Sequence, residues 1–289
     1  MVDNTKLVKL CTTASLLTAL TLICIKLYAW LMTDSVAIMS SLMDSSMDMI
    51  VSLINFIALR YSLKPADDDH GFGHGKAQDL ASLAEAIFIT FLSLVIGIQA
   101  VGRFLDPRPI ELGETGMVVM GISLTLTICL VAFQDYTYRK TQNNLIKADA
   151  THYLTDILTN LAVLVTVFLT TRYGWELLDP ILGGIIAIYI FRSAVDVGKT
   201  AFDNLMDTEF DEEKRQLILK VARSHPKVVE VKGLKTRKGG QNSFIQFEFT
   251  MDGSSTLDEA HKVAHEIEMC LHGEFPEAEI FIHQEPVVK

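Results

Sequence analysis

Six long apolar stretches fill the first two thirds of this 289-residue chain and constrain its fold more than any other feature. A helix needs about 20 mostly apolar residues to cross the roughly 30 Å hydrocarbon core of a membrane. The stretches that meet this requirement lie at about 8–32, 35–61, 78–101, 115–138, 145–171 and 178–200. We therefore predict an α-helical membrane protein whose transmembrane domain, residues 1–207, has six spans.

The last 80 or so residues have a different pattern, in which charged and apolar residues are mixed. Residues 244–251 alternate between apolar and polar side chains, which is typical of a half-buried strand. The helices and strands expected here are 211–224 (helix), 228–236 (strand), 244–251 (strand), 256–273 (helix) and 279–284 (strand). This αββαβ order predicts a small two-layer α+β domain over residues 208–289.

Basic residues are distributed unevenly around the predicted spans, and this predicts the orientation of the chain. An even number of spans places both termini on one side. That side would carry Lys6, Lys9, Arg60, Lys64, Lys76, Arg139, Lys140, Lys147 and Lys199. The opposite loops would carry only Arg103, Arg108 and Arg172, with Lys26 near the end of a span. Because loops rich in lysine and arginine stay in the cytoplasm, we expect both termini there.

Charge and cysteine content exclude some classes of protein. The net charge is −10, and no cluster of basic residues offsets it, so we expect no nucleic-acid partner. The four cysteines form no C-x-x-C pair, and we expect them to be free thiols.

Two of the predicted spans carry acids and a histidine at helical spacing. Asp44 and Asp48 are four residues apart in the second span, and His152 and Asp156 are four apart in the fifth. A carboxylate in hydrocarbon costs about 2.5–3.5 kcal/mol on insertion scales, so such residues are seldom incidental. Spacing of four puts each pair on one helix face.

These two pairs also reach similar depths. At about 1.5 Å per residue, the first pair lies roughly 14–20 Å into the membrane and the second roughly 8–18 Å from the other side. Two facing helices could then offer three carboxylates and one imidazole, a set that suits zinc. Cobalt, ferrous iron and cadmium also fit by ligand type. The alternative is that the acids make polar contacts with the serines beside them.

A second group of possible ligands lies in the loop after the second span. Asp67, His70 and His74 have a spacing that can hold zinc. The alternative is a solvated acidic loop with two incidental histidines. Glu85 and Arg192 occur singly in spans, and for each we favour a structural or water-facing role.

Together these motifs resemble the cation diffusion facilitators, and in particular their bacterial zinc, cadmium and iron efflux branch. The resemblance rests on DSSMD at 44–48, HYLTD at 152–156 and RYSLKPADDDHGFGHGKA at 60–77. It implies a transport site at Asp44, Asp48, His152 and Asp156, and a separate cytoplasmic metal site at Asp67, His70 and His74. It also implies a homodimer in the bacterial inner membrane.

The resemblance extends to the junction and the tail. Lys76 and Asp207 match an ion pair between membrane domain and tail. His261 and His283 match ligands of a metal cluster between two subunits, and Glu285 stands where the branch usually has Asp. Lys232 and Glu248 depart from it, because close relatives carry His at both positions. Two readings stay open: a reduced site of His261, His283 and Glu285 with Glu248 as a further ligand, or a metal-free tail with Lys232 supplying the charge.

The charge of the predicted transport site indicates a mechanism. Three carboxylates and a neutral imidazole carry −3, which a divalent ion reduces to −1. An empty site of charge −3 is costly in a low dielectric, so protons should replace the departing metal. We therefore predict a secondary active transporter, not an enzyme, that exports Zn²⁺, or Cd²⁺ or Fe²⁺, in exchange for protons by alternating access.

Two other classes of function remain as alternatives. A passive divalent-cation channel or a membrane metal sensor would use the same ligands without proton exchange. An intramembrane metalloprotease would also need zinc in the bilayer, but the sequence has no H-E-x-x-H.

Overall fold

The computed structural model describes residues 4–33, 36–105, 114–173, 178–240 and 242–287. The chain forms two compact units, which are treated separately here. One contains the residues up to Leu63 together with Ala77–Phe202, and the other contains Lys64–Lys76 together with Asp203–Lys289. Arg108, one of the basic residues from which the orientation is predicted, lies outside the described residues.

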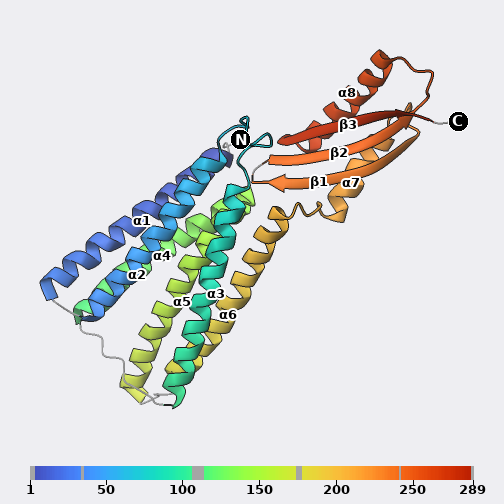
Figure 1. The fold of residues 1–289 in the computed structure, drawn as a ribbon. Coiled ribbons are helices and arrows are strands. Elements are labelled where there is room, and N and C mark those ends of the chain that lie inside the picture. The colour runs from blue at the N-terminus through green and yellow to red at the C-terminus, as the bar shows by residue number, and fades with distance from the viewer. Residues whose placement is uncertain (1–3, 34–35, 106–113, 174–177, 241, 288–289) are drawn as a thin grey trace. The chain divides into compact units, whose positions relative to one another are not determined.

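All six predicted stretches are helical (Figure 1). The helices are α1 (Asn4–Thr33), α2 (Val36–Ser62), α3 (Ala77–Leu105), α4 (Glu114–Thr141), α5 (Asn144–Tyr173) and α6 (Leu178–Leu205). Within the described residues, five of them are long and apolar enough to cross a membrane. The sixth, α5, is not among those five, and it carries Lys147, Asp149, His152 and Asp156. The fold is that of a helical membrane domain followed by a small α+β domain.

The helical unit buries many polar side chains and exposes many large apolar ones. Large apolar side chains such as Ile98 and Leu105 are exposed, as expected of helices that face lipid. Buried polar residues include Ser15, Ser45, Ser52, Ser82, Gln134 and Asp149. Because lipid provides no hydrogen bonds, these polar groups must find their partners within the protein, on the same or a neighbouring helix. α1 packs against α2 and α4, and α5 packs against α4 and α3.

Small residues let α6 approach α3 closely. A Cβ atom added at Gly198 would lie 3.2 Å from the Cβ of Ala86, and one added at Gly183 would lie 3.4 Å from the Cβ of Ala100. Small side chains at a helix interface shorten the distance between backbones and increase van der Waals contact.

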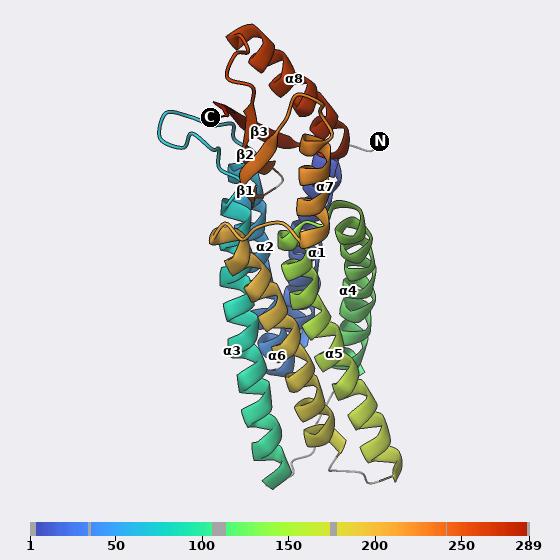
Figure 2. The same ribbon diagram turned by 90° about the vertical axis from the view of Figure 1, so that its right-hand side faces the viewer.

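The second unit contains the predicted αββαβ order (Figure 2). Its elements are α7 (Glu212–Arg223), β1 (Glu230–Gly239), β2 (Asn242–Met251), α8 (Leu257–Glu274) and β3 (Ala278–Pro286). The sheet order is β1-β2-β3, with β1 and β2 antiparallel and β2 and β3 parallel. A parallel pair needs a crossover, and α8 provides it.

One face of this sheet forms the core with both helices. Phe247 and Phe249 on β2 are fully buried against Ile218 of α7 and Ile267 of α8. Their alternation with polar residues confirms the strand expected at 244–251. Thr256 begins α8 with a capping box to Glu259.

The loop Lys64–Lys76 belongs to the same compact unit as the tail. Gly75 lies so close to the turn between β1 and β2 that a Cβ atom there would overlap the carbonyl of Gly239. Phe72 packs edge-on against Phe244, with ring centroids 5.5 Å apart. The guanidinium of Arg237 stacks on both rings, 4.2 Å from the centroid of Phe72 and 4.7 Å from that of Phe244.

Candidate metal centres

The interior of the helical unit brings together ligand groups from α2 and α5. Asp48, His152 and Asp156 each place one ligand atom within 4.8 Å of the others. His152 Nε2 lies 3.2 Å from Asp48 Oδ1. Asp48 and His152 are both buried. Three of the four ligands expected from the sequence therefore converge between two helices.

Asp44, the fourth expected ligand, does not belong to this group. It lies one turn before Asp48 on α2, and its side chain is exposed. Its role as a ligand stays a prediction.

The chemistry of the converging groups suits a divalent cation. Two carboxylate oxygens and one imidazole nitrogen match the oxygen and nitrogen ligands of zinc. The other ring nitrogen of His152, Nδ1, is buried and has no hydrogen-bond partner within the described part of the chain. A metal-binding histidine is usually oriented through that second nitrogen. Here the imidazole ring of His152 packs against two neighbouring aromatic rings instead. The ring centroids of Phe88 and Tyr153 lie 6.1 Å and 5.6 Å from the centroid of His152.

Lys26 on α1 is a buried cation beside these acids, and the sequence did not assign it a role. Its ammonium donates to the carbonyl of Ser41 at 3.1 Å and to the hydroxyl of Ser45 at 2.7 Å. Its charge acts on Asp48, Asp156 and Asp44. The only signal in the sequence is a lysine inside an otherwise apolar stretch, and that pattern does not say which acids it faces.

The loop between α2 and α3 forms a second group of ligands. Asp67, His70 and His74 again have ligand atoms within 4.8 Å of one another, as their spacing predicts. Asp67 Oδ1 accepts from the backbone N–H of His70 at 2.7 Å and lies 3.0 Å from its Nδ1. Asp67 Oδ2 lies 3.2 Å from His74 Nε2.

The tautomer of His74 follows from its partner. A carbonyl oxygen can only accept, so His74 Nδ1, 3.2 Å from the carbonyl of Pro65, must donate. In a neutral ring, Nε2 then carries a lone pair that faces a carboxylate oxygen. A cation between these two atoms would relieve their repulsion, so the residues fit a metal ion.

Asp67 is held as an anion at this site. Burial would raise its pKa, but the hydrogen bonds from His70 and the charges of His70 and His74 outweigh it, so the pKa of Asp67 is lowered. An ionised Asp67 is the form that binds a metal ion.

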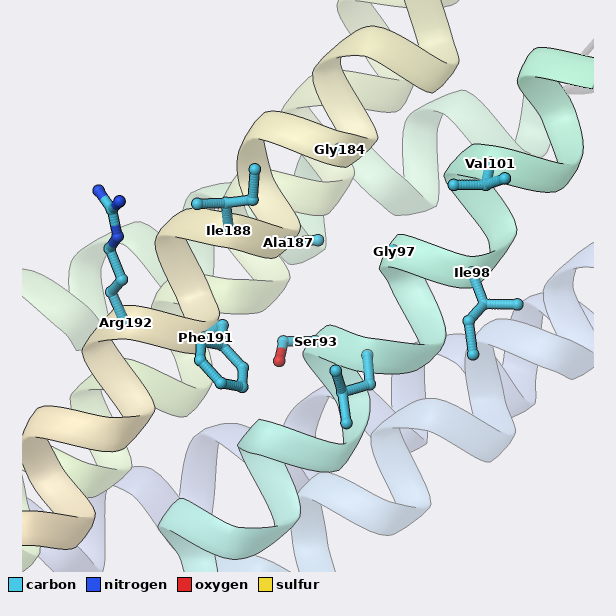
Figure 3. A pocket seen from close by; sticks show the side chains of 10 residues that line it. Ser93, Gly97, Ile98, Val101, Gly184, Ala187, Ile188, Phe191 and Arg192 are labelled. Atoms are coloured by element: carbon cyan, nitrogen blue, oxygen red, sulfur yellow. The ribbon is translucent and has the colours of Figure 1, made fainter.

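A cavity in the helical unit is of a different kind. It lies between α3 and α6 and has a volume of about 720 Å³ (Figure 3). Its walls are apolar apart from Ser93 and Arg192, and they include no Asp, Glu, His or Cys. It therefore offers no set of ligands for a metal ion.

Comparison with known proteins places these features in one family. The model of the cation efflux transmembrane domain matches residues 12–206, which is more than half of the chain. The chain belongs to the cation-efflux family. A second model, of the cytoplasmic domain of cation efflux proteins, matches residues 210–287. The family is one of membrane transporters, which agrees with the expected multi-pass fold.

Named relatives match nearly the whole cation-efflux chain. The cation-efflux pump FieF of Shewanella oneidensis is 41% identical over 280 residues, which cover 97% of this chain and 94% of the relative. Protein p34 of Rickettsia rickettsii is 41% identical over 98% of this chain and 94% of its own length. The FieF pump of Citrobacter koseri is 39% identical over 97% of this chain and 93% of its own length.

The tail of this cation-efflux protein does not gather its expected ligands within one subunit. Among the described residues, His261, His283, Glu285 and Glu248 form no group like the two above. Glu248 pairs with Lys232 on one side and with His283 on the other, so the three form a row across the sheet. His261 lies on α8.

Lys232 contributes a positive charge to this row. Its ammonium lies 2.9 Å from Glu230. The hydrogen bond to Glu230, its charge, and the charges of Glu285 and Glu248 raise the pKa of Lys232. Lys232 is therefore a cation at its place in the row.

Lys76 and Asp207, the pair expected from the resemblance, are in contact. Lys76 Nζ lies 2.9 Å from Asp207 Oδ1 and also donates to the carbonyl of Leu205 at 3.1 Å. Arg237 lies 3.4 Å from the other carboxylate oxygen. Burial opposes ionisation of Asp207, but Lys76 and then Arg237 outweigh it and lower its pKa.

Proposed function

We propose that this cation-efflux protein exports Zn²⁺ from the cytoplasm in exchange for protons. The main observation that supports this proposal is that Asp48, His152 and Asp156 converge between α2 and α5 in the interior of the helical unit. Cd²⁺ and Fe²⁺ are the other cargoes that the same ligands admit. We further propose a homodimer in the bacterial inner membrane, with both termini in the cytoplasm.

Charge balance supports the exchange. Two carboxylates facing each other in a low-dielectric interior repel unless a cation lies between them. In the metal-bound state that carries zinc outward, the metal ion is this cation. In the metal-free state that returns, protons on the imidazole and on a carboxylate reduce the repulsion instead. Alternating access, in which the ligands face one side at a time, would let the inward proton gradient drive the metal outward.

The loop ligands have a different role in this proposal. Asp67, His70 and His74 would bind a metal that stays in place, because they lie outside the helical unit. In the tail, the row of Lys232, Glu248 and His283 favours the metal-free alternative, since Lys232 supplies positive charge. Ligands shared with the second subunit remain the competing arrangement.

Purified protein in sealed vesicles tests the exchange. With a zinc dye and a pH dye inside, zinc entry should be accompanied by proton exit, and an imposed pH gradient should change the zinc rate. Zinc entry without proton movement would indicate a channel, and no movement of either ion would reject transport. Vesicles without protein give the background.

Changing His152 to Asp should weaken the preference for zinc. The substitution replaces the only nitrogen ligand of the group with oxygen, and oxygen ligands suit manganese better than imidazole does. We expect the ratio of zinc to manganese flux to fall by about tenfold, a discrimination of about 1.4 kcal/mol. His225→Asp, in the tail, is the control and should keep the original ratio. An unchanged ratio in His152→Asp would remove His152 from the ligand set.

A further inference from the structure

A second pair of buried carboxyl groups lies in the helical unit, outside the metal ligands. Glu85 on α3 is 5% exposed and Asp149 on α5 is 0% exposed. The side-chain amide of Asn55, on α2, donates to both: its Nδ2 lies 3.0 Å from Glu85 Oε2 and 3.2 Å from Asp149 Oδ1. One amide group thus links two acids from two other helices.

The two acids have very unequal surroundings. Asp149 also accepts from the hydroxyl of Ser15 at 2.6 Å and from Nε2 of Gln134 at 2.7 Å. The second oxygen of Glu85, Oε1, is buried without any hydrogen-bond partner among the described residues. No lysine or arginine forms an ion pair with either acid within the described ranges.

This inequality assigns a protonation state to each group. Two carboxylates held by one amide in a dry interior cannot both be ionised without a nearby cation. Three donors stabilise the anion of Asp149, whereas Glu85 has one donor and an orphan oxygen. We propose that the Glu85–Asp149 pair binds one proton, carried by Glu85, at a site separate from the metal ligands.

The pair is placed to respond to the metal. Asp149 precedes His152 by three residues, about one turn of α5. His152 of α5 is the titratable group that acts on both acids, and Asp149 in turn acts on Tyr153 of α5 and Cys11 of α1. A divalent ion bound at His152 favours loss of a nearby proton by simple repulsion. The pair therefore releases its proton when metal binds, an inference that rests on the proposed exchange.

A separate group of hydrogen bonds joins the ends of the same three helices. The amide of Gln78, in the first turn of α3, donates to Ser62 at the end of α2 at 2.7 Å. Asn143, just before α5, donates to the oxygen of Gln78 at 2.6 Å. In the proposed orientation these are the cytoplasmic ends, so the pair lies on the cytoplasmic side of the metal ligands.

Calorimetric zinc titrations of the full-length protein in buffers of different ionisation enthalpy test this proposal. They give the number of protons released per zinc bound. Glu85→Gln keeps an oxygen that can accept from Asn55 but cannot hold the exchangeable proton. We expect it to bind as many zinc ions per subunit as the wild type and to release about one proton fewer. Glu85→Asp, which restores a carboxyl, should regain most of the difference, and Asp135→Asn, on the exposed face of α4, should show none.

An equal proton count in wild type and Glu85→Gln would overturn the proposal. If the glutamine variant does not fold, infrared difference spectra of the wild type test the proposal. Zinc binding must then remove a band from a protonated carboxyl group. Spectra in which zinc removes no such band would also overturn the proposal. Failure of the proposed exchange would give a different result. Vesicles with the wild-type protein would then move zinc without counter-protons, whatever number of protons Glu85→Gln releases per zinc bound.

Discussion

Replacing Asp156 with asparagine should reduce zinc flux to the level of protein-free vesicles. The substitution keeps the shape of the side chain and removes one of the two carboxylates that converge with His152. The remaining carboxylate and imidazole leave zinc with two protein ligands, too few for its usual four-coordinate site. The loss should be complete at every pH tested, because the missing charge does not depend on protonation.

The vesicle assay described above measures this effect, with circular dichroism and gel filtration to confirm the fold. Asp135→Asn is the matched control, since Asp135 is an exposed acid of the same helical unit that pairs only with Arg139 at 2.7 Å. Asp44→Asn asks separately whether the exposed acid of α2 takes part. Flux near the wild-type level in Asp156→Asn would show that the converging residues are not the transport site.

Replacing His74 with alanine should remove about one metal ion per subunit from the loop. His74 is a buried ligand whose ring is fixed by the carbonyl of Pro65, and its loss leaves Asp67 with the exposed His70. Loss of a well-oriented ligand costs more than the 10–100-fold in affinity that is typical of outer-shell partners. Zinc flux should persist, because the loop ligands lie outside the helical unit.

Metal content by mass spectrometry after dialysis measures the loss. An Asp156→Asn background removes the transport-site ion from the count. Asp69→Asn is the control, since only its backbone N–H contacts Asp67. The lowered pKa of Asp67 adds a test: this group stays ionised as the pH falls through its ordinary value near 3.9, so release of metal at milder acidity must come from the imidazoles. Equal metal content in His74→Ala and Asp69→Asn would contradict the loop site.

Much of the fold could be predicted because it depends on local pattern. Hydropathy located every long helix, and alternation located the strand with Phe247 and Phe249. The prediction that α5 is a sixth span stays a prediction: Asp149, His152 and Asp156 lower its hydropathy, and α5 is not among the five described helices that are apolar enough to cross a membrane. Asp149 and His152 are nevertheless buried in the helical unit, so their polar groups are kept away from its surface.

The candidate sites could be predicted only as far as spacing within one segment allows. Spacing of three and four residues revealed Asp67, His70 and His74, and it revealed each half of the intramembrane group. It could not show that Asp44 lies outside the converging set. It also could not link Asn55, Glu85 and Asp149, because their hydrogen bonds join three helices that are distant in the sequence.

The shared packing of loop and tail has a practical consequence for anyone who truncates this protein. A fragment that starts near Asp203 would retain every strand yet lack residues 64–76. The aromatic ring of Phe244 and the guanidinium of Arg237 would lose Phe72, which contacts both in the intact chain. Solubility or metal uptake measured on such a fragment would reflect a newly uncovered surface as well as the tail itself.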